Sequence, residues 1–118
     1  MNERHAVVLV AVGGFVGATA RYVAGLVLPP LVSTFAANVV GCFALGWLLY
    51  SYRLDAVSER LRLLTATGFL SSFTTYSTFA YEVFEASPAV GAVYVVASYS
   101  VGFFAVYAGT RTALRGEA

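Results

Sequence analysis

The sequence predicts an all-α integral membrane protein with four transmembrane helices, because charged residues are scarce and apolar residues form four long segments. Of the 118 residues, 59% are hydrophobic and only 11% are charged, whereas soluble domains carry about 25% charged residues. Each apolar segment approaches the ~20 residues that a helix needs to cross the hydrocarbon core. Backbone groups in lipid need internal partners, so helices are expected. Residues 1–118 form a single four-helix subunit.

The first two segments are separated by a pair of prolines. The first runs from about Ala6 to Leu28 and ends at Pro29-Pro30, where the missing amide donors and the crowded preceding turn stop a helix. The second runs from about Val32 to Tyr52. The short connection between them carries no charge.

The third and fourth segments follow a charged connection. The third spans roughly Leu61 to Phe84. The fourth begins at Ser87-Pro88, a hydroxyl cap followed by proline at the first helical position, and continues to about Ala108. No linker or low-complexity segment interrupts this pattern.

The arginines indicate the orientation of the chain. With four spans, the N-terminus, the middle connection and the C-terminus share one side of the membrane. The arginines on that side are Arg4, Arg53, Arg60, Arg62, Arg111 and Arg115. The two connections on the other side carry none, and Glu82 and Glu85 lie near that side. The positive-inside rule therefore predicts a multi-pass plasma-membrane protein with both termini in the cytoplasm.

The remaining composition argues against several classes of function. A net charge of +1 without a basic stripe gives no indication of nucleic-acid binding. Cys42 is the only cysteine and is expected to act as a small hydrophobe. His5 stands alone, no nucleophile–base pair is visible, and no carboxylate lies in the middle of a span. We therefore expect neither an enzyme nor proton-coupled transport.

An arginine lies in the outer part of the first span. Gly13, Gly17 and Arg21 are spaced four residues apart and fall on one helix face. The glycines let another helix approach closely, so the arginine is expected to face protein or an aqueous vestibule. The alternative is an interfacial arginine that extends its head group to the membrane surface.

An asparagine, Asn38, lies early in the second span. A carboxamide supplies two hydrogen-bond donors without net charge, which suits an anion that must be held briefly and released. Taken alone, however, Asn38 is more simply explained by a hydrogen bond between two helices.

Hydroxyl residues are concentrated in the middle of the third span. They are Ser71, Ser72, Thr74, Thr75, Ser77 and Thr78. Such side chains compete for backbone hydrogen bonds, so the third helix is predicted to be broken near the bilayer midplane. Carbonyl groups freed by a break can hold a cation. The alternative is a polar seam between two continuous helices.

Aromatic and hydroxyl side chains continue this polar region. Tyr76 and Phe79 are three residues apart and share a helix face, and their electropositive ring edges can meet a small anion. In the fourth span, Tyr94, Ser98 and Gly102 also share one face. Ordinary packing is the usual reason for an aromatic pair.

The third-span segment resembles the signature of a known channel family. The run Gly68-Phe69-Leu70-Ser71-Ser72-Phe73-Thr74-Thr75-Tyr76-Ser77-Thr78-Phe79 is similar to the third-helix motif of the CrcB/Fluc fluoride channels. The segments 13–22 and 38–46 resemble the first-helix and second-helix motifs of that family, in the same order. The resemblance covers nearly the whole chain.

The resemblance implies an antiparallel dimer with two narrow pores that passively exports fluoride and confers fluoride resistance. It also implies a structural Na⁺ at the dimer centre, held by the backbone carbonyls of Ser71 and Thr74 from both subunits. Arg21 would attract anions to the vestibule. The implied pore and fluoride-binding residues are Asn38, Tyr76, Phe79, Ser77, Thr78, Ser98 and Tyr94.

Three residues depart from the family pattern. Tyr76 replaces the usual phenylalanine and adds a hydroxyl to the expected pore wall. Ser71 and Ser72 stand where two glycines are common. If the Na⁺ site requires a backbone conformation that only glycine adopts readily, these serines disfavour it.

The arginine distribution bears on the dimer partner. An antiparallel homodimer requires one chain to insert in both directions, which needs little arginine bias. Here the bias is strong. We therefore expect this chain to insert in one direction and to pair with a related subunit that faces the other way.

Two other functions fit a chain of this size. A small four-helix multidrug or guanidinium exporter would be similar in length, but such chemistry normally uses a membrane-embedded glutamate, and the first span has none. A membrane assembly subunit without transport activity is the other alternative.

Overall fold

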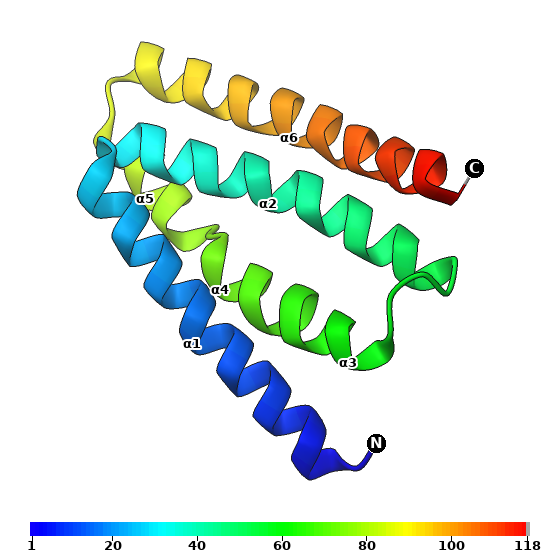
Figure 1. The fold of residues 1–118 in the computed structure, drawn as a ribbon. Helices are drawn as coiled ribbons and strands as arrows, with labels where there is room; N and C mark the ends of the chain where they lie inside the picture. The colour runs from blue at the N-terminus through cyan, green and yellow to red at the C-terminus, as the bar shows by residue number, and fades with distance from the viewer. Residues whose placement is uncertain (118) are drawn as a thin grey trace.

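The computed structural model describes residues 1–117 and is helical throughout, apart from short connections (Figure 1). The prediction of an all-helical membrane protein is confirmed. Within the described residues, three helices are long and apolar enough to cross a membrane, namely α1, α2 and α6. The elements are α1 (Glu3–Val27), α2 (Pro30–Arg53), α3 (Glu59–Arg62), the π-helical segment η1 (Leu63–Leu70), α4 (Ser71–Phe73), α5 (Ser77–Glu85) and α6 (Pro88–Glu117).

Polar side chains and prolines set the helix boundaries. At the start of α1, the Asn2 side chain accepts a hydrogen bond from the His5 amide at 3.0 Å. Pro30 occupies the first turn of α2, where its missing amide costs nothing. Ser58 caps α3 and Ser87 caps α6 in the same way as Asn2 caps α1.

The helices form two closely packed pairs. The most extensive contacts join α2 to α6 and α1 to η1. Figure 1 shows α2 between α6 and the segmented run α3–η1–α4–α5, with α1 against the other side of that run. Both chain ends and the connection between α2 and α3 lie at one end of the molecule, as an even number of passes requires (Figure 1).

Large apolar side chains cover much of the outer surface. The two most completely buried side chains are Ser33 and Thr34. Large apolar residues such as Phe15 and Phe84 are mostly exposed, at 75% and 83%. A soluble monomer rarely exposes so much contiguous apolar surface, so lipid is the natural surroundings of this outer face.

Glycines allow α1 to lie directly on the third helical run. A Cβ atom at Gly13 would lie 2.0 Å from the Leu64 carbonyl oxygen, and one at Gly17 would lie 2.2 Å from that of Phe69. Only residues without a side chain permit this approach, as expected from the spacing of the two glycines.

Two predicted boundaries differ from the structure. The fourth helix was expected to end near Ala108 but continues through Glu117. Hydropathy marks where the apolar environment ends, whereas the helix itself continues as a polar extension because nothing there breaks it. The first helix likewise begins at Glu3 and not at Ala6.

Candidate functional site

The third helical run is interrupted at residues 74–76, between α4 and α5. Thr74 has an extended backbone, with φ −83° and ψ 160°. The amide of Thr75 therefore turns away from the preceding helical turn. In the described chain, the carbonyl oxygens of residues 71–74 accept no hydrogen bond from a following amide. The interruption thus leaves several backbone acceptors free.

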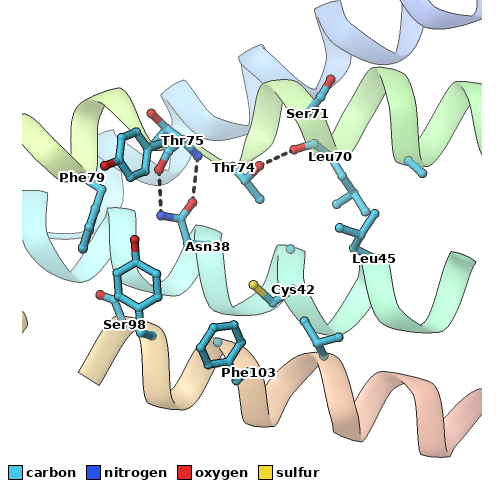
Figure 2. Close-up of a pocket in the computed structure, with 16 residues that line it drawn as sticks. Asn38, Cys42, Leu45, Leu70, Ser71, Thr74, Thr75, Phe79, Ser98 and Phe103 are labelled. Carbon is cyan, nitrogen blue, oxygen red and sulfur yellow. Dashed lines mark hydrogen bonds between the residues drawn. The ribbon is translucent and has the colours of Figure 1, made fainter. Parts of the chain in front are cut away.

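Asn38 of α2 stabilises this interruption (Figure 2). Its side-chain oxygen accepts a hydrogen bond from the Thr75 amide at 2.8 Å, and its side-chain nitrogen donates to the Thr75 carbonyl at 2.9 Å. A carboxamide carries two N–H donors. One N–H therefore remains available for another acceptor.

Several hydroxyls of the third run complete the helices on either side of the interruption. Thr74 donates to the Leu70 carbonyl at 2.8 Å, and Ser71 donates to the carbonyls of Thr67 and Gly68. Thr75 accepts from the Thr78 amide at 3.1 Å, which caps the first turn of α5. These hydroxyls maintain the interruption as well as line it.

A largely apolar cavity of about 460 Å³ adjoins the interruption. Asn38 of α2, Phe79 of α5 and Ser98 of α6 line it together (Figure 2). The Ser98 hydroxyl oxygen is buried and has no hydrogen-bond partner within the described residues. An unpartnered buried hydroxyl is costly. Its O–H hydrogen is therefore uncommitted, and Ser98 is among the residues that line this cavity.

Phe79 lies at the centre of an aromatic cluster. Its ring centroid lies 5.0 Å from that of Tyr94 and 6.1 Å from that of Tyr99, the latter in an edge-on arrangement. Tyr76 lies 6.2 Å away on the other side. Phe79 is 8% exposed, whereas Tyr76 is 72% exposed. Of the predicted aromatic pair, Phe79 is therefore buried and Tyr76 lies at the surface of the chain.

A second, more polar cavity of about 470 Å³ lies on the α1 side of the interruption. Arg21, Ser77 and Thr78 line it, and Asn38, Phe79 and Ser98 do not. The three residues of the interruption line both cavities, and so does Ser71 of α4.

Arg21 is held by hydroxyls of α2. Its guanidinium donates to Ser33 at 3.0 Å and to Thr34 at 2.8 Å, and its Nε atom is buried without a partner in the described chain. Neither hydroxyl neutralises the charge. The guanidinium therefore faces protein and the polar cavity.

The structure divides the predicted site residues into two groups. Asn38, Tyr76, Phe79 and Ser98 share the apolar cavity, whereas Arg21, Ser77 and Thr78 adjoin the polar one. Tyr94 lines neither cavity and reaches the site through the Phe79 ring.

Some residues of the site were not singled out by sequence reasoning. Ser33 and Thr34 hold Arg21, Glu82 accepts a hydrogen bond from Tyr94, and Tyr99 packs on Phe79. The sequence could have indicated only Ser33 and Thr34, because two adjacent hydroxyls at the start of an apolar helix need hydrogen-bond partners.

Comparison with known proteins agrees with these features. A 51% identical relative from Natronomonas pharaonis, named fluoride-specific ion channel FluC 1, matches 86% of this chain and 87% of its own length. A relative from Chlorobium phaeobacteroides, named fluoride-specific ion channel FluC, is 40% identical and matches 96% and 97%. A third, from Oceanobacillus iheyensis and of the same name, is 40% identical and matches 92% and 91%.

The family model described as CrcB-like protein, Camphor Resistance (CrcB), matches residues 8–110. This range includes the interruption, both cavities and Arg21. The chain belongs to the CrcB-like protein family.

Proposed function

We propose that this chain is a subunit of a fluoride-selective channel that passively exports fluoride from the cytoplasm and so confers fluoride resistance. The relatives named as fluoride-specific ion channels support fluoride as the conducted ion. The observation that carries the proposal is the grouping of Asn38, Phe79 and Ser98 around one cavity beside an interrupted helix.

The chemistry of this cavity suits a small halide. Fluoride gives up its water reluctantly, so a selective path must replace that water with fixed donors in a narrow space. The spare Asn38 N–H and the Ser98 hydroxyl are such donors, and the Phe79 ring edge is electropositive. None carries a net charge, so the ion is held weakly enough to leave.

Arg21 attracts anions from outside the narrow part of the path. A full positive charge inside the path would bind fluoride too tightly for rapid release. Its position in the polar cavity, anchored by Ser33 and Thr34, keeps the charge near the vestibule. Ser77 and Thr78 continue a polar lining from there toward the interruption.

The functional unit in this proposal is an antiparallel dimer with two pores. Tyr76 projects largely into open space in the isolated chain, and its hydroxyl would be covered by a second subunit. The strong arginine bias favours a related, oppositely oriented subunit over a second copy of this chain.

In this arrangement, the interruption lies near the bilayer midplane. Residues 74–76 are close to the middle of the helical run 59–85, which supports that depth. The arginine bias places both termini on the cytoplasmic side of the plasma membrane.

A structural Na⁺ at the dimer centre fits the residues present. The carbonyl oxygens of Ser71 and Thr74 are among those that accept no backbone hydrogen bond, and oxygen atoms suit a hard cation. The serines at positions 71 and 72 do not oppose this site. Ser71 has φ −65°, and Asp55 is the only non-glycine residue with positive φ among residues 1–117. When bound, Na⁺ would supply a positive charge that holds the two interruptions together.

Fluoride efflux from liposomes that contain the purified protein tests the proposed function. We expect rapid efflux at a fluoride electrode, no chloride efflux, and no need for a pH gradient. Efflux that depends on a proton gradient would favour a small exporter. Absence of efflux, alone and with the oppositely oriented relative, would favour an assembly subunit.

A further inference from the structure

Tyr94 of α6 makes a hydrogen bond that determines how its hydroxyl can be used. The Tyr94 hydroxyl donates to a carboxylate oxygen of Glu82 in α5 at 3.0 Å. A phenol has one O–H hydrogen. That hydrogen is committed to Glu82, so Tyr94 does not offer it to an anion in the cavity.

The same tyrosine also contacts α5 one turn earlier. Its ring packs on Phe79 with centroids 5.0 Å apart, and the Tyr94 side chain is buried. Phe79 and Glu82 are three residues apart and share a helix face. Tyr94 therefore contacts α5 at two points, the ring of Phe79 and the carboxylate of Glu82.

The α5 helix depends on such contacts. It has nine residues, too few for an isolated helix to be stable. It begins directly after the interruption, so the preceding helix does not hold it in line. Its contacts with α6 and α2 therefore determine where Phe79 lies.

Glu82 lies close to the candidate path but outside it. The carboxylate belongs to the turn that follows Phe79, yet Glu82 lines neither of the two cavities. Its bond to Tyr94 directs it toward α6.

We propose that Tyr94 is a positioning residue: its hydroxyl latches Glu82 against α6, and thereby fixes Phe79 and keeps a negative charge away from the outer end of the anion path. This inference rests on the proposed channel function. It assigns Glu82 the role of a charge that must be restrained, and assigns Tyr94 a different role from that of a fluoride donor.

Fluoride efflux from liposomes tests the latch with four proteins: wild type, Tyr94→Phe, Glu82→Gln and the double variant. Tyr94→Phe keeps the ring but releases the carboxylate, and an anion a few ångströms from the path slows efflux about tenfold by repulsion. Glu82→Gln retains an acceptor for Tyr94 and leaves efflux near the wild-type rate. The double variant recovers most of the lost efflux, because no charge is released.

Two matched controls accompany these variants. Tyr107→Phe removes a hydroxyl from the same helix at a ring that is mostly exposed and lines neither cavity, and Glu85→Gln removes the other carboxylate of α5. Both should conduct normally. Wild-type efflux in Tyr94→Phe, or a double variant as slow as Tyr94→Phe, would overturn the proposal, since a purely packing role gives no rescue by charge removal.

Thermal unfolding in detergent separates the latch from the channel function. The melting temperature should fall less when Tyr94→Phe is introduced into Glu82→Gln than into the wild type. Additive changes would reject the latch whether or not the protein conducts. Wild-type liposomes without efflux would reject the channel function, and coupled melting temperatures would then still support the latch.

Discussion

At the scale of single residues, Asn38 combines two tasks in one carboxamide. Both polar ends of the side chain pair with the Thr75 peptide group, and one N–H remains for an anion. Burying an unpaired peptide group in a membrane costs several kcal/mol, on the order of that in any apolar medium. The residue that offers a donor to the cavity therefore also maintains the interruption that forms it.

Asn38→Ala is expected to abolish most fluoride efflux. The substitution removes the spare donor and leaves the Thr75 amide and carbonyl unpaired, at about 1–3 kcal/mol for each group. The measurement is liposome efflux of protein that elutes as a single folded species. Thr110→Ala is the control, because that hydroxyl bonds only within α6. Unchanged efflux in folded Asn38→Ala would show that the anion path lies elsewhere.

Phe79→Ala is expected to reduce efflux strongly for a different reason. The ring is buried against two tyrosines, and its loss removes both the electropositive edge and about 3–5 kcal/mol of packing. Phe84→Ala, on the same helix but 83% exposed, should retain efflux and stability. Equal efflux from the two alanine variants would contradict a role for the Phe79 ring.

At the scale of helices, the third run is the unusual element. It begins as α3, continues as the π-helical η1, and resumes as α5 after the interruption. π-Helical turns are rare and occur mainly at functional sites. Here η1 packs on the glycine face of α1, so α1 acts as the support that carries the run up to residues 74–76.

Gly17→Ala is expected to lower stability by about 1–3 kcal/mol, because the added methyl would lie 2.2 Å from the Phe69 carbonyl oxygen and force α1 away from η1. Gly25→Ala in the same helix meets only the Arg21 side chain at 3.7 Å and should be neutral or slightly stabilising. Thermal unfolding in detergent compares the two. A similar melting temperature for both variants would contradict the close approach of α1.

At the scale of the whole molecule, the single chain encloses the candidate cavity only in part. Many large apolar side chains face outward, and the cavity beside Asn38 opens at the surface. A second subunit over this opening would enclose the cavity, whereas lipid offers no hydrogen bond to a polar lining residue such as Asn38. The opening is one reason to propose a dimer.

A single direction of insertion is the corresponding expectation. Six of the seven arginines lie at the end of the molecule that carries both termini, and positive charge resists translocation. Tags at the two ends should therefore be accessible only from the cytoplasm when the chain is expressed alone. Equal accessibility from both sides would support a homodimer, and Gly91→Arg, which adds a charge near the opposite end, should weaken the preference.

The sequence contained enough information to predict the helices but only part of the site. Apolar runs of about 20 residues and the prolines at positions 29 and 30 located the spans, because hydropathy and amide loss act locally. The hydroxyl-rich segment indicated where the third helix is unusual. The pairing of Asn38 with Thr75 joins residues 37 positions apart, and no local pattern specifies such a partner.

What the sequence by itself determined is therefore the class of protein, the number of helical passes and the residue types of the site. The tertiary structure decided which of those residues meet: it placed Asn38 with Phe79 and Ser98, placed Arg21 with Ser77 and Thr78, and bonded Tyr94 to Glu82. The physical reason is the distance along the chain over which each effect acts. Burial in lipid and helix propensity act on neighbouring residues in the chain, whereas a buried hydrogen bond selects its partner only after the helices have packed.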